Sequence, residues 1–186
     1  MTLQRVLVLG YGNPGRLDDG LGPALAAALE NDNLPGVTVD SDYQLTVEDA
    51  DIAARHEIVI FADAAVAGSE PFYFRRIQPR DELGFSSHSV EPAGVLALAG
   101  KLFNATPQGF ALGIRGYRFN EFGEELSPRA QANLSAVLEF LRRALRTGTF
   151  EEVGDLPLGQ GDRDLVTKSA GSAPAPEPGL SQAGEN

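Results

Sequence analysis

The chain has 186 residues, no cysteine and a formal net charge of −11 at pH 7. This length predicts one domain with room for a tail, and the acidic charge disfavours a nucleic-acid partner, whose phosphates need clustered lysine and arginine. The absence of cysteine excludes disulfides, thiolate ligands and cysteine nucleophiles. Together with the lack of a secretory signal or an apolar run of roughly 18 residues, it predicts a cytoplasmic protein without membrane association.

The first half of the chain alternates strand and helix patterns. A short apolar run that ends at a glycine predicts a strand over residues 6–9. Leucines spaced four residues apart, with a proline in the first turn, predict a helix over 22–31. A second strand is predicted over 37–40 after a Pro-Gly turn. A further helix is predicted with Thr46 as its cap and acidic residues in its first turn.

The second half continues the alternation. The apolar run 58–63 predicts a central parallel strand that is buried on both faces. The run 71–77 begins with a proline, which favours an edge strand. A helix over 92–103 and a strand over 110–114 follow. The pair Ser127-Pro128 predicts the cap and first residue of a long helix with an apolar stripe.

This order predicts an α/β fold in one domain, with a mostly parallel sheet and helices on both of its faces. We assign residues 1–148 to this domain and residues 149–186 to a flexible acidic tail. The tail is rich in proline, glycine and alanine and has no aromatic residue after Phe150. Such a composition buries too little apolar surface to offset the entropy lost on ordering.

The loop after the first strand carries the strongest functional signal. It reads Gly10-Tyr11-Gly12-Asn13-Pro14-Gly15, followed by Arg16-Leu17 and the adjacent carboxylates Asp18 and Asp19. The glycines allow a sharp turn and a close approach of the backbone. The carboxylates would repel a phosphate, so the loop favours a cation or proton transfer over a nucleotide.

Sites in open α/β sheets lie at the carboxyl ends of the strands. Asp19 follows the first strand, Asp63 ends the third, and His88 lies in a small polar loop before a helix. Two carboxylates and one imidazole with open positions suit a divalent ion such as nickel or zinc. Plainer alternatives exist for each residue: Asp18 or Asp19 could cap the next helix, Asp63 could be a turn residue or a helix cap, and His88 could be a polar surface residue. His56 is expected to be a solvated surface residue.

Several segments together resemble the [NiFe]-hydrogenase maturation endopeptidase family, over roughly residues 5–146. They are Gly10-Tyr11-Gly12-Asn13, Asp18-Asp19-Gly20-Leu21-Gly22, Phe61-Ala62-Asp63-Ala64, Ser87-His88-Ser89, Gly113-Ile114 and Gly123-Glu124-Glu125-Leu126-Ser127. The resemblance implies a five-stranded twisted sheet flanked by helices, of the phosphorylase/hydrolase-like type. One departure is Asp42-Tyr43-Gln44-Leu45, which replaces an Asp-Gly-Gly-type segment and suggests a subgroup with its own hydrogenase partner.

The resemblance also implies a function. A member of this family is an aspartic-type endopeptidase that trims a C-terminal peptide from a hydrogenase large-subunit precursor after nickel insertion. The catalytic and metal-binding residues then correspond to Asp19, Asp63 and His88, and the nickel is carried by the substrate. The protein is expected to act as a monomer. Nickel could polarise the scissile carbonyl or activate a water, or a carboxylate such as Asp18 could act as a general base without it.

Two other functions are considered. Peptidyl-tRNA hydrolases also open with a strand and a Gly-x-Gly-Asn-Pro-Gly segment, but they carry an asparagine and a histidine soon afterwards. Here the corresponding region holds Asp18-Asp19, and the first histidine is His56. The second alternative is an accessory protein that binds hydrogenase or nickel without cutting, which a cleavage assay would distinguish.

Overall fold

The computed structural model describes residues 4–80 and 90–154. Its elements in chain order are β1 (Val6–Tyr11), the short 3-10 helix η1 (Leu17–Gly20), α1 (Leu21–Glu30), β2 (Val37–Asp42), α2 (Asp49–Ala54), β3 (Ile58–Ala65), β4 (Phe72–Ile77), α3 (Pro92–Phe103), β5 (Gln108–Arg115) and α4 (Pro128–Thr147). Each predicted strand and helix is present, and most strands run one or two residues further than predicted. His88 and the tail from residue 155 onward lie outside the described residues.

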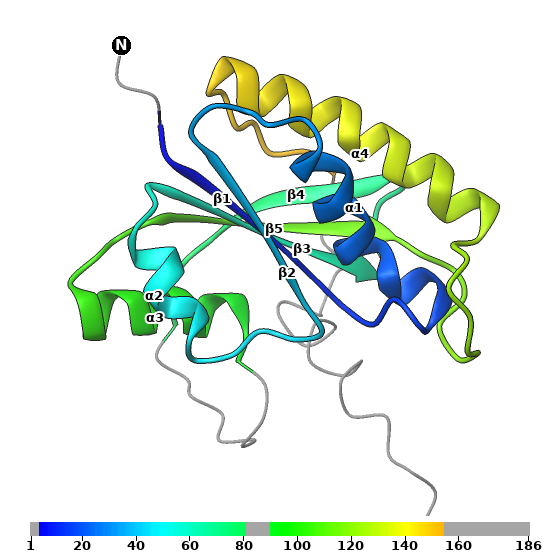
Figure 1. Cartoon of the computed structure of the whole chain (residues 1–186), viewed down its shortest axis with the longest axis horizontal. Helices are drawn as coiled ribbons and strands as arrows, with labels where there is room; N and C mark the ends of the chain where they lie inside the picture. Colours follow the sequence, from blue (N-terminus) through cyan, green and yellow to red (C-terminus); the bar gives the residue numbers. More distant parts are fainter. Residues whose placement is uncertain (1–3, 81–89, 155–186) are drawn as a thin grey trace, which may run out of the picture.

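The five strands form one sheet in the order β2-β1-β3-β5-β4 (Figure 1). β1 pairs in parallel with β2 and β3, and β3 pairs in parallel with β5. Only the edge strand β4 runs antiparallel, beside β5. The structure thus confirms the mostly parallel sheet, the central place of β3 and the edge position of β4.

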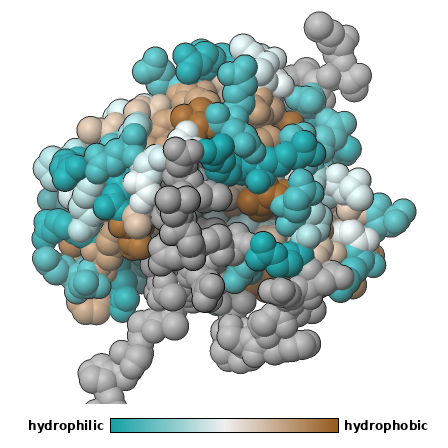
Figure 2. Space-filling model, turned by 180° about the vertical axis from the view of Figure 1, so that it is seen from behind, coloured by the Kyte–Doolittle hydropathy of each residue, from teal (hydrophilic) through white to brown (hydrophobic). Residues whose placement is uncertain are grey.

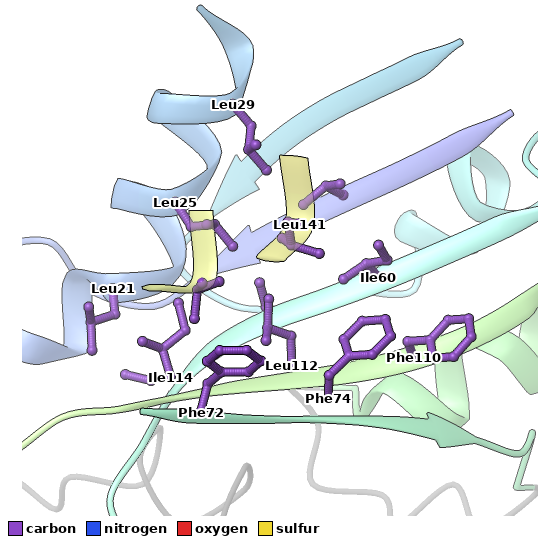
Figure 3. Close-up of a cluster of buried hydrophobic side chains, with 14 of the residues drawn as sticks. Leu21, Leu25, Leu29, Ile60, Phe72, Phe74, Phe110, Leu112, Ile114 and Leu141 are labelled. Carbon is purple, nitrogen blue, oxygen red and sulfur yellow. The ribbon is translucent and has the colours of Figure 1, made fainter. Parts of the chain in front are cut away.

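Helices cover both faces of the sheet, α1 and α4 on one and α2 and α3 on the other (Figure 1). Figure 3 shows Leu21, Leu25 and Leu29 of α1 on the side of the helix that faces the strands, near Leu141 of α4. The spacing of four residues puts the three leucines on one stripe. The second cluster packs apolar residues of α2 and α3 against the opposite face of β1 and β3.

Of the four α-helices in the described residues, only α4 begins with a side-chain cap. Ser127 caps α4, because its hydroxyl oxygen accepts a hydrogen bond from the Ala130 N–H, and Pro128 is the first helical residue. Helix α2 begins at Asp49 with Glu48 at the cap position, whereas Thr46 was predicted to be the cap. The Asp49 carboxylate accepts a hydrogen bond from the Thr46 N–H at 2.6 Å, so these residues form a capped turn that precedes the helix.

The chain stays on the sheet beyond the predicted boundary at residue 148. Phe150 packs against Phe110 with ring centroids 5.8 Å apart. Val153 and Phe74 exchange two backbone hydrogen bonds at 2.8 and 2.9 Å. Glu152 accepts hydrogen bonds from the backbone of Arg76 and from the Arg75 guanidinium. Residues 150–153 therefore add a short antiparallel contact to the edge strand.

The face shown in Figure 2 is covered mainly by hydrophilic side chains, with smaller hydrophobic areas between them. Across the described residues, the exposed large hydrophobic side chains are Tyr43, Val47, Val66, Leu102, Phe103 and Phe122. Within residues 4–80 and 90–154, no helix has the length and apolar character that crossing a membrane requires.

Candidate active site

Asp63 lies near the carboxyl end of the central strand β3. Its side chain is only 4% exposed, and one of its oxygens, Oδ1, accepts a hydrogen bond from the Ala64 N–H at 2.7 Å. Burial without such a donor would disfavour a carboxylate. The backbone contact therefore helps to hold this side chain in one orientation at the edge of the sheet.

The loop after β1 brings Asp19 to the same edge. Gly12 has a φ of +137°, a conformation that side chains disfavour. A Cβ atom at Gly12 would lie 2.1 Å from the Asp19 carbonyl oxygen. The Asp19 carboxylate in turn accepts a hydrogen bond from the Asn13 N–H at 3.1 Å. The glycine is thus required for the turn that folds Asp19 back over the end of β1.

Atoms of both Asp19 and Asp63 lie close to Gly12. The same Cβ position at Gly12 lies 3.5 Å from Asp63 Oδ1. The Asp19 backbone carbonyl and the Asp63 carboxylate, 44 positions apart in the sequence, therefore both lie against Gly12. The structure brings these two predicted residues together, and their role as ligands or catalytic groups stays a prediction.

His88, the third predicted residue, lies outside the described part of the chain. The described chain resumes at Val90, whose N–H donates to the Leu45 carbonyl in the loop after β2. This contact lies at the carboxyl edge of the sheet, where α3 then begins. Among residues 4–80 and 90–154, no group of three histidine, aspartate or glutamate side chains is placed to hold a metal ion.

Asp18 has a different role from its neighbour. The prediction that it caps α1 is wrong, because Gly20 is the cap and no side chain caps this helix. The fully buried Asp18 carboxylate accepts hydrogen bonds from the N–H groups of Tyr117, Arg118 and Ser127, and from the Ser127 hydroxyl, at 2.7 to 3.0 Å. Asp18 therefore ties the loop between β5 and α4 to the candidate site.

The pKa of the Asp18 carboxylate is consistent with its role in binding the loop between β5 and α4. Burial acts to raise the pKa of Asp18, but the hydrogen bonds from Ser127, Tyr117 and Arg118 outweigh it and hold the pKa below its ordinary value. The carboxylate is thus charged and saturated with donors at neutral pH. This arrangement argues against Asp18 as a water-activating base.

The loop between β5 and α4 lies directly against the loop that carries Asp19. Leu17 donates from its N–H to the Gly123 carbonyl at 2.7 Å, and Gly123 donates to the Gly15 carbonyl at 2.9 Å. Sequence reasoning missed this contact because about 100 positions separate the partners. The local signal in the sequence was the pair of adjacent carboxylates, of which Asp18 binds the loop between β5 and α4.

His56 lies away from the candidate site, between the end of α2 and the start of β3. Its Nδ1 is 2.8 Å from the Ile52 carbonyl oxygen and its Nε2 is 2.8 Å from the Thr38 hydroxyl. The ring therefore bridges α2 and β2 instead of being only a solvated surface group. It belongs to the amino edge of the sheet.

Asp19 and Asp63 are suited either to bind a metal ion or to accept a proton. Each has one oxygen held by a backbone N–H, so its orientation is set before any ligand arrives. Carboxylate oxygens with a histidine nitrogen form a donor set for divalent transition metals. A carboxylate at such an edge can alternatively accept a proton from a water molecule.

Solved structures of hydrogenase maturation peptidases share this fold. A hydrogenase 2 maturation peptidase from a Thaumarchaeota archaeon is 28% identical, with a TM-score of 0.58, and the match covers 77% of this chain and 99% of that one. An endopeptidase from Escherichia coli is 25% identical, with a TM-score of 0.60 and coverage of 81% and 97%. The [NiFe] hydrogenase maturation protease HycI from Thermococcus kodakarensis is 23% identical, with a TM-score of 0.60 and coverage of 77% and 93%. No protein-family model matches the sequence, and no curated protein matches it either.

Proposed function

We propose that this chain, which belongs to the [NiFe]-hydrogenase maturation endopeptidase family, removes the C-terminal extension of a hydrogenase large-subunit precursor after nickel has been inserted. The nickel already held by the precursor is the recognition element. Asp19, Asp63 and His88 are the residues that contact it.

The observation that carries the proposal is the meeting of Asp19 and Asp63 around Gly12. The Asp19 carboxylate, on η1 after β1, and the Asp63 carboxylate of β3 each have one oxygen held by a backbone N–H at the carboxyl edge of the sheet. This is the edge where open α/β sheets bind their ligands. The family membership supports the choice of a peptide bond as the substrate.

The donor set fits nickel that arrives with the substrate. The chain contains no cysteine, so it offers only oxygen and nitrogen ligands. Such a set without thiolate is a weak chelator for the free ion. The precursor's own ligands would hold the nickel, and the three enzyme side chains would complete its coordination only in the complex.

Cleavage itself is a hydrolysis. The oxygen of a water molecule bonds to the scissile carbonyl carbon, the C–N bond breaks, and the leaving amine takes a proton. An aspartate at the site can accept the proton that the water loses. Asp19 is better placed than Asp63 for this step because it is only partly buried, whereas Asp63 is almost fully covered.

The proposal is tested by incubating the full chain with a large-subunit precursor, nickel-loaded or nickel-free, and measuring product mass. The loaded precursor should become shorter and the nickel-free precursor should not. Asp63→Asn and His88→Ala should abolish processing while the melting temperature stays close to that of the wild type. His56→Ala is the matched histidine control and should retain processing.

Three results would contradict the proposal. Efficient cleavage of the nickel-free precursor would show that nickel is not recognised. Full activity of both Asp63→Asn and His88→Ala would show that other residues carry out the cleavage. Tight binding of the loaded precursor without any cleavage would favour the accessory protein over the peptidase.

A further inference from the structure

Phe122 is an exposed aromatic residue in the loop between β5 and α4. It is 88% exposed, more than any other large hydrophobic residue in the described part of the chain. Figure 1 shows this loop beside the loop after β1, and a bridge between Arg16 and Gly123 joins the two. Phe122 therefore stands next to the loop that carries Asp19, with a large apolar surface left in water.

The backbone on both sides of Phe122 is fixed. The buried Asp18 carboxylate accepts a hydrogen bond from the Tyr117 N–H before the ring and from the Ser127 N–H after it. Gly123, the next residue, forms two backbone hydrogen bonds with the loop after β1. Because the loop is ordered before a partner arrives, binding through Phe122 costs little additional conformational entropy.

Most of the other exposed large hydrophobic residues lie at the same edge of the sheet. Tyr43 and Val47 follow the carboxyl end of β2, and Val66 follows that of β3. Leu102 and Phe103 lie elsewhere, at the end of α3 and before the amino end of β5. A single exposed hydrophobic residue is ordinary, but their concentration around the edge that carries the candidate site indicates a contact surface.

The charges around the Phe122 ring are mainly negative. Glu124 and Glu125 are exposed, and neither forms an ion pair with another described residue, whereas Glu121 pairs with Arg118 at 2.6 Å. The Arg16 guanidinium lies 5.7 Å from the ring centre, within the range of a cation–π contact, and supplies one positive charge against two negative ones. A complementary partner surface therefore has an apolar pocket bordered by lysine or arginine.

This chemistry favours a folded partner other than a second copy of this chain. A projecting ring is well buried only in a pocket, which an extended peptide does not provide. A second copy would bring further negative charge, because the chain carries a net charge of −11. Residues 155–186 are also net acidic and contain no aromatic residue, so the chain's own tail is a poor match for this surface.

We propose that Phe122, Glu124 and Glu125, called the Phe122 surface, dock the folded body of the large-subunit precursor. The ring enters an apolar pocket of the precursor, and the two carboxylates face basic residues at its border. This contact lies beside the candidate site and separate from it, so it adds affinity for the whole precursor. The proposal rests on the proposed function for the identity of the partner.

Docking is tested by calorimetric titration of the full chain with nickel-loaded precursor. Asp63→Asn is used as the background, because it is expected not to cleave. Adding Phe122→Ala should raise Kd about tenfold or more and leave the melting temperature unchanged, since the ring is exposed. Phe103→Ala, which removes an exposed phenylalanine near the opposite edge, is the matched control and should not change Kd. An unchanged Kd with Phe122→Ala would overturn the proposal.

The charge of the partner surface is tested in the same background. Glu124→Lys should weaken binding several-fold at low salt and less at high salt, because salt screens charges near the surface. Glu139→Lys, on an exposed glutamate of α4, is the control and should bind like the background protein. Equal or tighter binding with Glu124→Lys would overturn the proposed basic border.

Two further measurements separate this proposal from its alternatives. In sedimentation of the chain alone, a dimer that Phe122→Ala dissociates would assign the surface to a second copy and overturn the proposal. Cleavage by the wild type, with an unchanged Kd for Phe122→Ala, would overturn the docking surface and leave the proposed function standing. Binding that depends on Phe122 without any cleavage by the wild type would support the docking surface and contradict the peptidase.

Discussion

Asp18 and Asp19 are adjacent in sequence but serve different parts of the molecule. Asp18 is fully buried and accepts four hydrogen bonds from the loop between β5 and α4. Asp19 is partly exposed and lies beside Gly12 and Asp63. One residue of difference along the 3-10 helix η1 separates the buried carboxylate that holds the loop between β5 and α4 from the partly exposed carboxylate beside Gly12.

The buried carboxylate predicts a large effect of a conservative substitution. Asp18→Asn puts an amide NH₂ among donors that need an acceptor, so we expect the free energy of unfolding at neutral pH to fall by about 2 to 4 kcal/mol. Urea denaturation of both proteins measures this loss. Asp32→Asn removes a half-buried carboxylate that pairs with Arg142 near the surface and should cost less. Equal losses from the two substitutions would contradict the role given to Asp18.

The same carboxylate predicts a pH dependence. Because the pKa of Asp18 is lowered in the folded protein, its stabilising contribution is fully present above the unfolded-state value near 3.8 and is lost as the pH falls through the folded-state pKa. The stability difference between the wild type and Asp18→Asn should therefore shrink below pH 3.8. Denaturation curves at neutral and acidic pH measure it, and a constant difference would contradict the assignment.

The candidate site illustrates how much of a site can be predicted from sequence. The proximity of Asp19 and Asp63 could be predicted because the ends of the strands are visible as local patterns and parallel strands end at the same edge of a sheet. The role of Asp18 could not, because its donors are 99 to 109 positions away.

At the scale of elements, α1 approaches the sheet at a distance that only glycine permits. A Cβ atom at Gly22 would lie 2.3 Å from the Tyr11 carbonyl oxygen and 2.6 Å from that of Ala62. A Cβ at Gly10 would lie 2.2 Å from the Gly22 carbonyl oxygen. The first turn of the helix therefore rests directly on the backbones of β1 and β3, three residues after Asp19.

This contact predicts opposite effects of two glycine-to-alanine changes. Gly22→Ala should destabilise the protein by about 2 kcal/mol or more, because its methyl group meets rigid backbone. Gly100→Ala in α3 meets only the Ala105 carbonyl oxygen at 3.6 Å and should stabilise the helix by roughly 0.5 to 1 kcal/mol. Thermal melts measure both, and equal effects would contradict the close approach of α1.

The elements themselves were largely predictable, and their ends less so. Ser127-Pro128 indicated the start of α4 because a cap and a proline at the first position act within one turn. The strands ran further than predicted because pairing with neighbours, rather than local apolar character, decides where a parallel strand ends. β2 shows this, since its polar residues Ser41 and Asp42 stay paired with β1.

At the scale of the whole molecule, the end of the folded domain is set by packing and not by composition. The tail composition changes near residue 149, and the sequence predicted the boundary there. Phe150 and Val153 nevertheless contact the core, and Glu152 binds the edge strand through Arg75 and Arg76. A single aromatic residue and one apolar residue are enough to hold a polar segment on an open sheet edge.

Two shortened chains test where the domain ends. A chain that ends at Gly148 loses the Phe150 and Val153 contacts and the two hydrogen bonds to Phe74. Its free energy of unfolding should be lower by about 2 to 3 kcal/mol than that of the full chain, the value of one partly buried aromatic and one partly buried aliphatic side chain. A chain that ends at Gly154 keeps these contacts and should melt like the full chain. Phe150→Ala in the full chain should reproduce most of the loss. Identical melting temperatures for the full chain and both shortened chains would support the predicted domain boundary at residue 148. The contacts of residues 150–153 with β4 and β5 would then contribute nothing to stability.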